Sequence, residues 1–156
     1  MKLKRKYWNF FILAIATGTF WLNVLMTSPT VAKTALTKEE IAQMVRRQAK
    51  AWEEQDVTAI SDDFAEDAIF IAAGFKFEGK QRIKQAARDY FKQFHDTYVK
   101  IERIIIDGNE GAVQWDWRDR NRQSGREGFA EDAIIFGLEN GKIVYWREYI
   151  EKKKPI

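Results

Sequence analysis

The chain contains no cysteine and a single histidine, His95. Without cysteine it can form no disulfide and perform no thiol chemistry. A metal ion would have to rely on oxygen ligands, and the acidic residues show no spacing typical of a metal site. The sequence also lacks a phosphate-binding loop, a nucleophile elbow and a dinucleotide fingerprint. We therefore expect neither a metal nor an organic cofactor.

Outside its N-terminal segment, the chain also lacks an excess of basic or acidic residues. The 156 residues carry a net charge of +3, from 26 basic and 23 acidic residues. Lys2, Lys4, Arg5 and Lys6 lie in a segment without acids, and without them 22 basic residues face 23 acidic ones. Nucleic-acid binding requires a basic stripe, so we expect no nucleic-acid partner. The length suits one compact domain.

Residues 1–32 have the order of an export signal. A basic start is followed by an apolar run at residues 7–26 and by Thr30, Val31 and Ala32 as a cleavage site. We predict cleavage after Ala32 and export across the cytoplasmic membrane, to a periplasmic or secreted location. The alternative is an uncleaved anchor, because about 20 residues can just span a bilayer. Membrane contact is then confined to residues 7–26.

The rest of the chain divides into a linker at residues 33–36, one domain at 37–151 and a tail at 152–156. Three helices are predicted early in the domain. Thr37 to Glu40 form a capping box that begins the first, and Asp56 can cap a short second helix. The third is predicted at residues 80–95, where apolar residues recur at spacings of three and four. Two short strands are predicted at residues 68–73 and 75–77.

Four longer strands are predicted at residues 98–106, 112–120, 126–136 and 142–150. The segments between them are rich in glycine, asparagine and aspartate, which favour tight turns, so consecutive strands should pair as antiparallel hairpins. Early helices and late strands indicate an α+β fold in which about three helices cover a curved antiparallel sheet. We expect a pocket between the helices and the sheet.

One strand carries the best clue to function. Alternation in residues 112–120 places Val113, Trp115, Trp117 and Asp119 on one face. Binding pockets are mostly apolar with a few polar groups, so indole rings beside a carboxylate are typical of a ligand site. We predict aromatic ligand contacts at Trp115, Trp117, Trp146, Tyr90 and Phe70. Aromatic residues also build the core of any small domain, and both roles stay open for them.

The order of elements, with the segments Trp52 to Ile60, Phe64 to Ala68 and Gly141 to Tyr149, resembles the SnoaL-like branch of the nuclear transport factor 2-like superfamily. The similarity covers about residues 37–151. The resemblance implies a cone-shaped α+β fold with a pocket and a homodimer formed through the sheet. It implies no single function, because the superfamily includes isomerases, cyclases, epoxide hydrolases, dehydratases, transport adaptors and subunits without activity.

Comparison with two enzyme groups of that superfamily narrows the chemistry. The catalytic positions of ketosteroid isomerases fall at Ala72, Gln48 and Ala133, so none of the three catalytic side chains is present here. The positions of limonene epoxide hydrolases fall at Trp117, Asp119 and Glu148. Two of these three are acidic, but the arginine that should polarise the epoxide is missing unless Arg103 or Arg147 reaches the site from another strand.

The resemblance further implies that Glu148 faces inward, and the match at Ala133 adds Glu131 and Ile135 to the inner side. Three inward carboxylates, Asp119, Glu131 and Glu148, should not all stay charged, and burial with repulsion should raise at least one pKa. His95 could exchange protons with them, or cap the third helix. In the alternative, Asp119 and Glu131 lie at the solvent-exposed rim of the pocket, and Glu148 forms a hydrogen bond with a neighbouring arginine.

Three functions follow from this pattern. The first is an exported, dimeric domain that binds a small, partly apolar molecule. The second is a cofactor-free acid/base enzyme in which Asp119 and Glu148 act, assisted by Glu131 or His95. The third is a scaffold or accessory module whose outer sheet face binds a partner. Converging carboxylates would favour the enzyme, and a cavity filled solid by Trp115, Trp117 and Trp146 would rule out ligand binding.

Overall fold

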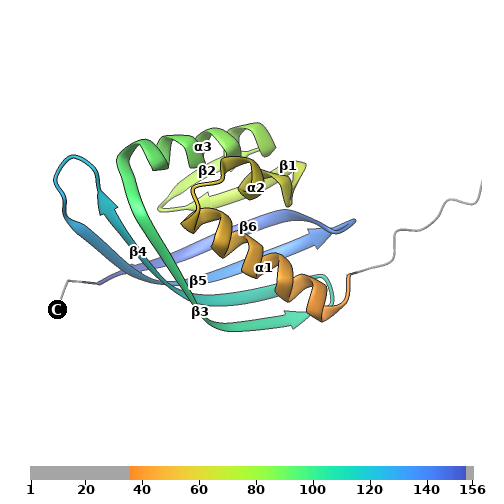
Figure 1. Cartoon of the computed structure of the whole chain (residues 1–156). Coiled ribbons are helices and arrows are strands. Elements are labelled where there is room, and N and C mark those ends of the chain that lie inside the picture. Colours follow the sequence, from red (N-terminus) through yellow and green to blue (C-terminus); the bar gives the residue numbers. More distant parts are fainter. Residues whose placement is uncertain (1–35, 154–156) are drawn as a thin grey trace, which may run out of the picture. The chain divides into compact units, whose positions relative to one another are not determined.

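The computed structural model describes residues 36–153 (Figure 1). No helix in that range is long and apolar enough to cross a membrane. The predicted export signal at residues 1–32 and the end of the predicted tail lie outside the described residues. Cleavage, anchoring and export therefore stay predictions.

Capping fixes the starts of the first two helices as predicted. In α1, Lys38–Glu53, the Thr37 hydroxyl accepts a hydrogen bond from the Glu40 amide at 3.2 Å, and Glu40 accepts one from the Thr37 amide at 2.7 Å. In α2, Val57–Asp62, the Asp56 carboxylate accepts the amides of Thr58 and Ala59. These bonds satisfy first-turn amides that would otherwise lack partners.

The third helix ends earlier than predicted. α3 spans Lys80–Gln93, and the chain passes directly into the strand β3, Phe94–Asp107. Phe94 and His95 pair with Asn121 and Arg120 of the next long strand. The placement of His95 at a helix end is therefore wrong, because sheet pairing takes over where the helical pattern of the sequence still continues.

Six strands form one open sheet in the order β2-β1-β6-β5-β4-β3. The remaining strands are β1, Phe64–Ala72, β2, Phe75–Glu78, β4, Glu110–Asn121, β5, Glu127–Glu139, and β6, Lys142–Lys152. The four late strands pair antiparallel in chain order, as predicted. β1 lies parallel to β6, so the sheet is mixed. The α+β class with helices over a curved sheet is confirmed (Figure 1).

The concave side of the sheet holds the core of the domain. Its largest fully buried side chains include Trp115, Trp146 and Phe136, and α1 adds Ile41 and Met44. Neighbouring rings pack closely: Trp146 lies 5.7 Å from Trp115 and 5.8 Å from Phe136 between ring centroids. Because these rings and the α1 side chains are buried in one cluster, the sheet is held to the helical layer chiefly by apolar contact.

The convex side of the sheet carries several exposed apolar and aromatic residues. Side chains about half exposed there are Tyr98, Ile105, Ile135 and Tyr149. The expectation that Ile135 faces inward is wrong, because Ile134, its neighbour in the alternation, is the fully buried residue. The homodimer implied by the family resemblance stays a prediction.

Candidate functional site

A hydrogen-bonded cluster joins the end of α3 to β4. The Tyr90 hydroxyl donates to Asp119 Oδ2 at 2.6 Å, and the Trp117 indole donates to the same oxygen at 3.2 Å and to the Tyr90 hydroxyl at 3.0 Å. The ring of Trp52, at the C-terminal end of α1, packs against both Tyr90 and Trp117. The predicted residues Tyr90, Trp117 and Asp119 therefore do come together, on the concave side.

Two features hold the Asp119 carboxylate in place and keep the Tyr90 hydroxyl protonated. Gly128 lies opposite Asp119 on β5, and a β-carbon there would collide with the Asp119 carboxylate. Burial and the Asp119 charge raise the pKa of Tyr90, so its hydroxyl stays a neutral donor. Asp119 is consequently held by two donors and is suited to positioning Tyr90 and Trp117.

Glu148 lies on the concave side of β6 and keeps part of its surface exposed. Its Oε1 accepts a hydrogen bond from the Trp146 indole at 3.0 Å. Burial raises the pKa of Glu148 to about 8, and the nearby Asp132 charge acts in the same direction, while the indole bond opposes it. The prediction that an inward carboxyl has a raised pKa is confirmed here. Within residues 36–153, Glu148 bonds this indole and forms no ion pair with an arginine.

Asp132 is the inward carboxylate that the sequence analysis missed. Its side chain is 4% exposed, and its Oδ2 accepts a hydrogen bond from the Trp115 indole at 3.1 Å. Its other oxygen, Oδ1, is buried without a partner among the described residues. Burial raises the pKa of Asp132 to about 6. Asp132 and Glu148 thus form an electrostatically coupled pair, each held by one indole N–H.

The inward placement of Glu131 is wrong. Glu131 is exposed, lies opposite Glu151 on the convex side, and pairs with Lys153 at 3.2 Å. Glu131 and Ala133 are exposed while Asp132 between them is buried, because one residue reverses the face of a strand. The catalytic role predicted for Glu131 rested on that placement.

His95 lies on β3 beside Asp96, with Nδ1 3.0 Å from Asp96 Oδ1. In the described part of the chain no hydrogen bond links it to Asp132, Glu148 or Asp119. Arg147 does not supply the missing arginine either, because its guanidinium lies 4.9 Å above the ring of Tyr149 and its side chain is exposed.

The five predicted aromatic ligand contacts separate into two groups. Trp115, Trp146 and Phe70 are buried and pack as core. Trp117 and Tyr90 keep partial exposure next to the hydrogen-bonded cluster. We therefore take Trp117, Tyr90 and Glu148 as the accessible part of the candidate site, with Asp132 behind them.

Comparisons with known proteins agree with this architecture. The sequence model of the SnoaL-like domain matches residues 45–146. A ketosteroid isomerase-like protein from Catenulispora acidiphila, described in complex with trimethylamine, has 16% identity and a TM-score of 0.65, over 69% of this chain and 84% of its own.

Two further solved structures have the same fold. An LEH-like epoxide hydrolase from M. tuberculosis has 20% identity and a TM-score of 0.64, over 72% of this chain and 84% of its own. A putative SnoaL-like polyketide cyclase from Jannaschia sp. has 15% identity and a TM-score of 0.65, over 76% and 91%. No curated protein matches the chain. At these identities the structures show a shared fold and leave the activity open.

Proposed function

Because the chain belongs to the SnoaL-like domain family, we propose that it binds a small, partly apolar molecule on the concave side of its sheet. The observation that carries this proposal is the buried Asp132 Oδ1, which has no partner in the described residues and lies beside a second carboxyl, Glu148. A buried polar atom left unpaired costs about 1–3 kcal/mol. A ligand whose donor group inserts past Trp117 and Glu148 to reach Asp132 Oδ1 would recover that cost.

The chemistry of the site favours a ligand with a cationic or N–H donor group. Carboxylates attract cations directly, and indole rings attract them through their π faces. Trp117 presents an indole at the accessible side, and Asp132, which is ionised at neutral pH, supplies a carboxylate behind it. Since a protein of the same fold is described in complex with trimethylamine, small amines with apolar substituents are the first class to test.

A thermal-shift screen with trimethylamine and larger tertiary amines tests this proposal. We expect at least one amine to raise the Tm, because a ligand at 100 times its Kd stabilises the fold by about 2.7 kcal/mol. Trp117→Ala should abolish the shift. Tyr98→Ala is the matched control, since Tyr98 is an aromatic residue on the convex side. Equal shifts in both variants, or none in the parent chain across the series, would contradict the proposal.

Acid–base catalysis is the second candidate function, favoured by the different pKa values of the coupled pair. With pKa values of about 6 for Asp132 and about 8 for Glu148, neutral pH leaves one carboxylate ionised and the other carboxyl protonated. Enzymes assign base and acid roles by separating the pKa values of two such groups. Asp132 would be the base and Glu148 the acid.

For any compound that the chain converts, Glu148→Gln should lower kcat by about 10²-fold or more while leaving binding intact. Glu151→Gln, an exposed glutamate on the same strand, is the control. Unchanged turnover in Glu148→Gln would remove the catalytic role.

Export with cleavage after Ala32 is part of the same proposal, supported by the pattern of residues 1–32. A mature chain that begins far from Lys33 would contradict the cleavage.

A further inference from the structure

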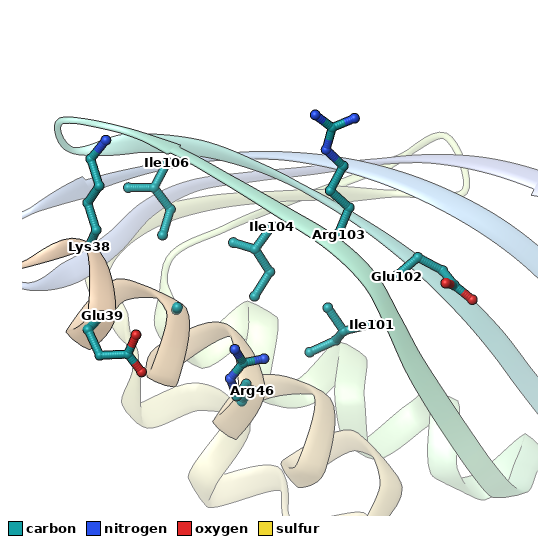
Figure 2. A pocket seen from close by; sticks show the side chains of 9 residues that line it. Lys38, Glu39, Arg46, Ile101, Glu102, Arg103, Ile104 and Ile106 are labelled. Atoms are coloured by element: carbon teal, nitrogen blue, oxygen red, sulfur yellow. The ribbon is translucent and has the colours of Figure 1, made fainter.

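A groove separate from the candidate site lies between the N-terminal half of α1 and the edge strand β3 (Figure 2). Its volume is about 390 Å³, within the range of small-molecule sites. The residues that line it are Lys38, Glu39, Ala42 and Arg46 from α1, and Ile101, Glu102, Arg103, Ile104 and Ile106 from β3. The candidate site, in contrast, lies near Trp52 at the other end of α1.

The floor of the groove is aliphatic and incompletely covered. An irregularity in the pairing of β3 with β4 between Ile101 and Arg103 lets Ile101 and Ile104 face α1 together, followed by Ile106. All three isoleucines keep partial exposure, whereas Val99 and Thr97, earlier on β3, are buried. Covering the remaining aliphatic surface would be favourable at about 25 cal/mol per Å².

The α1 side of the groove carries two cations, Lys38 and Arg46, without a partner among the described residues. Lys38 and Arg46 lie two turns apart on the stripe that includes Ala42. Neither forms a hydrogen bond or an ion pair with any residue from 36 to 153. The two acids of the lining are engaged elsewhere, because Glu39 accepts a hydrogen bond from Gln43 and Glu102 pairs with Lys100. Arg103 points away from α1 (Figure 2).

We propose that this groove binds a single-chain carboxylate, of the class of medium-chain fatty acids. The acyl chain covers Ile101, Ile104 and Ile106, and the carboxylate is held by the Arg46 guanidinium, whose planar donors suit two carboxylate oxygens. Lys38 adds positive potential at the other end of the groove. The occupant must combine an apolar chain with an anionic head. An anion alone would leave the isoleucine floor uncovered, and an apolar chain alone would leave Lys38 and Arg46 without an anionic partner.

Calorimetric titration of the full chain with decanoate and with decan-1-ol tests the class of ligand. We expect decanoate to bind at least about tenfold more tightly than decan-1-ol, because an ion pair with Arg46 adds to the same chain contact. Rising salt should weaken decanoate binding. Decanol binding as tight as decanoate binding, or the absence of decanoate binding, would overturn the proposal.

Paired variants test the location. Arg46→Gln and Ile104→Asp should each weaken decanoate binding by about tenfold, since they remove the cation or place a charge on the floor. The controls are Arg88→Gln, an exposed arginine on α3, and Ile105→Asp, on the opposite face of β3 from Ile104. Circular dichroism checks that each variant folds, and Arg46→Lys keeps the charge if Arg46→Gln does not fold. Equal losses in controls and test variants would overturn the proposal, whereas Trp117→Ala should leave decanoate binding unchanged.

Discussion

Raising the pH from about 5 to about 8.5 is expected to lower the free energy of unfolding of the domain by about 2–4 kcal/mol. The cause is the pair of concave-side carboxyls. Burial raises the pKa of Asp132 from 3.8 to about 6 and that of Glu148 from 4.5 to about 8. Unfolding returns both groups to water and to their ordinary pKa values.

The sign follows from the protons that each state holds. Between the unfolded and folded pKa values the folded chain binds more protons than the unfolded chain, so stability falls as the pH rises through this interval. The contribution is fully present below about pH 4 and lost as the pH passes about 6 for Asp132 and about 8 for Glu148. One pKa unit corresponds to about 1.4 kcal/mol, and we expect less than the full sum because Glu148 keeps partial exposure.

Urea denaturation at a series of pH values measures this slope. The double variant Asp132→Asn with Glu148→Gln should lose most of the pH dependence, because neither position can then titrate. Glu131→Gln with Glu151→Gln is the matched control, since these two glutamates pair across the same two strands on the convex side. A slope that persists in the first double variant, or disappears in the control, would assign the pH dependence to other groups.

Strand alternation alone could have placed Asp132 correctly. Apolar residues occupy every second position of β5 at Ala130, Ile134, Phe136 and Leu138, all of them buried. Asp132 is the polar member of that series, and the period of two puts it on the inner face. The match of Ala133 to the family implies an inward Glu131, and the burial pattern of β5 contradicts it. On a single strand, local periodicity was the stronger physical argument.

Other features depend on contacts that local patterns do not encode. The N-caps of α1 and α2, the hairpins and the face of Trp115, Trp117 and Asp119 all arise from short-range chemistry and are predictable from the sequence. The parallel pairing of β1 with β6 joins segments more than 70 residues apart, and nothing in β1 itself specifies that partner. The early end of α3 is likewise decided by the pairing of Phe94 and His95 with β4. Packing also decides which aromatic rings stay accessible.

Trp115→Ala is expected to destabilise the domain by about 3–5 kcal/mol, the range for truncating a buried tryptophan or phenylalanine. Trp115 is fully buried, and its ring packs against Trp117 and Trp146 on either side. The substitution removes these contacts and also leaves both oxygens of Asp132 without a donor. Tyr149→Ala, about half exposed on the convex side, should change stability by no more than about 1 kcal/mol. Comparable losses in both variants would mean that Trp115 is not part of the core.

Trp115→Phe separates the packing of the ring from its hydrogen bond. Phenylalanine fills most of the same space but cannot donate to Asp132 Oδ2. Since the indole bond lowers the pKa of Asp132 against the effect of burial, its loss should raise that pKa further. The destabilisation by Trp115→Phe should therefore be larger at pH values where Asp132 is ionised, near pH 8, than near pH 5. A loss of stability independent of pH would show that Trp115 acts through packing alone, and that the indole does not hold the carboxylate on which the proposed ligand site depends.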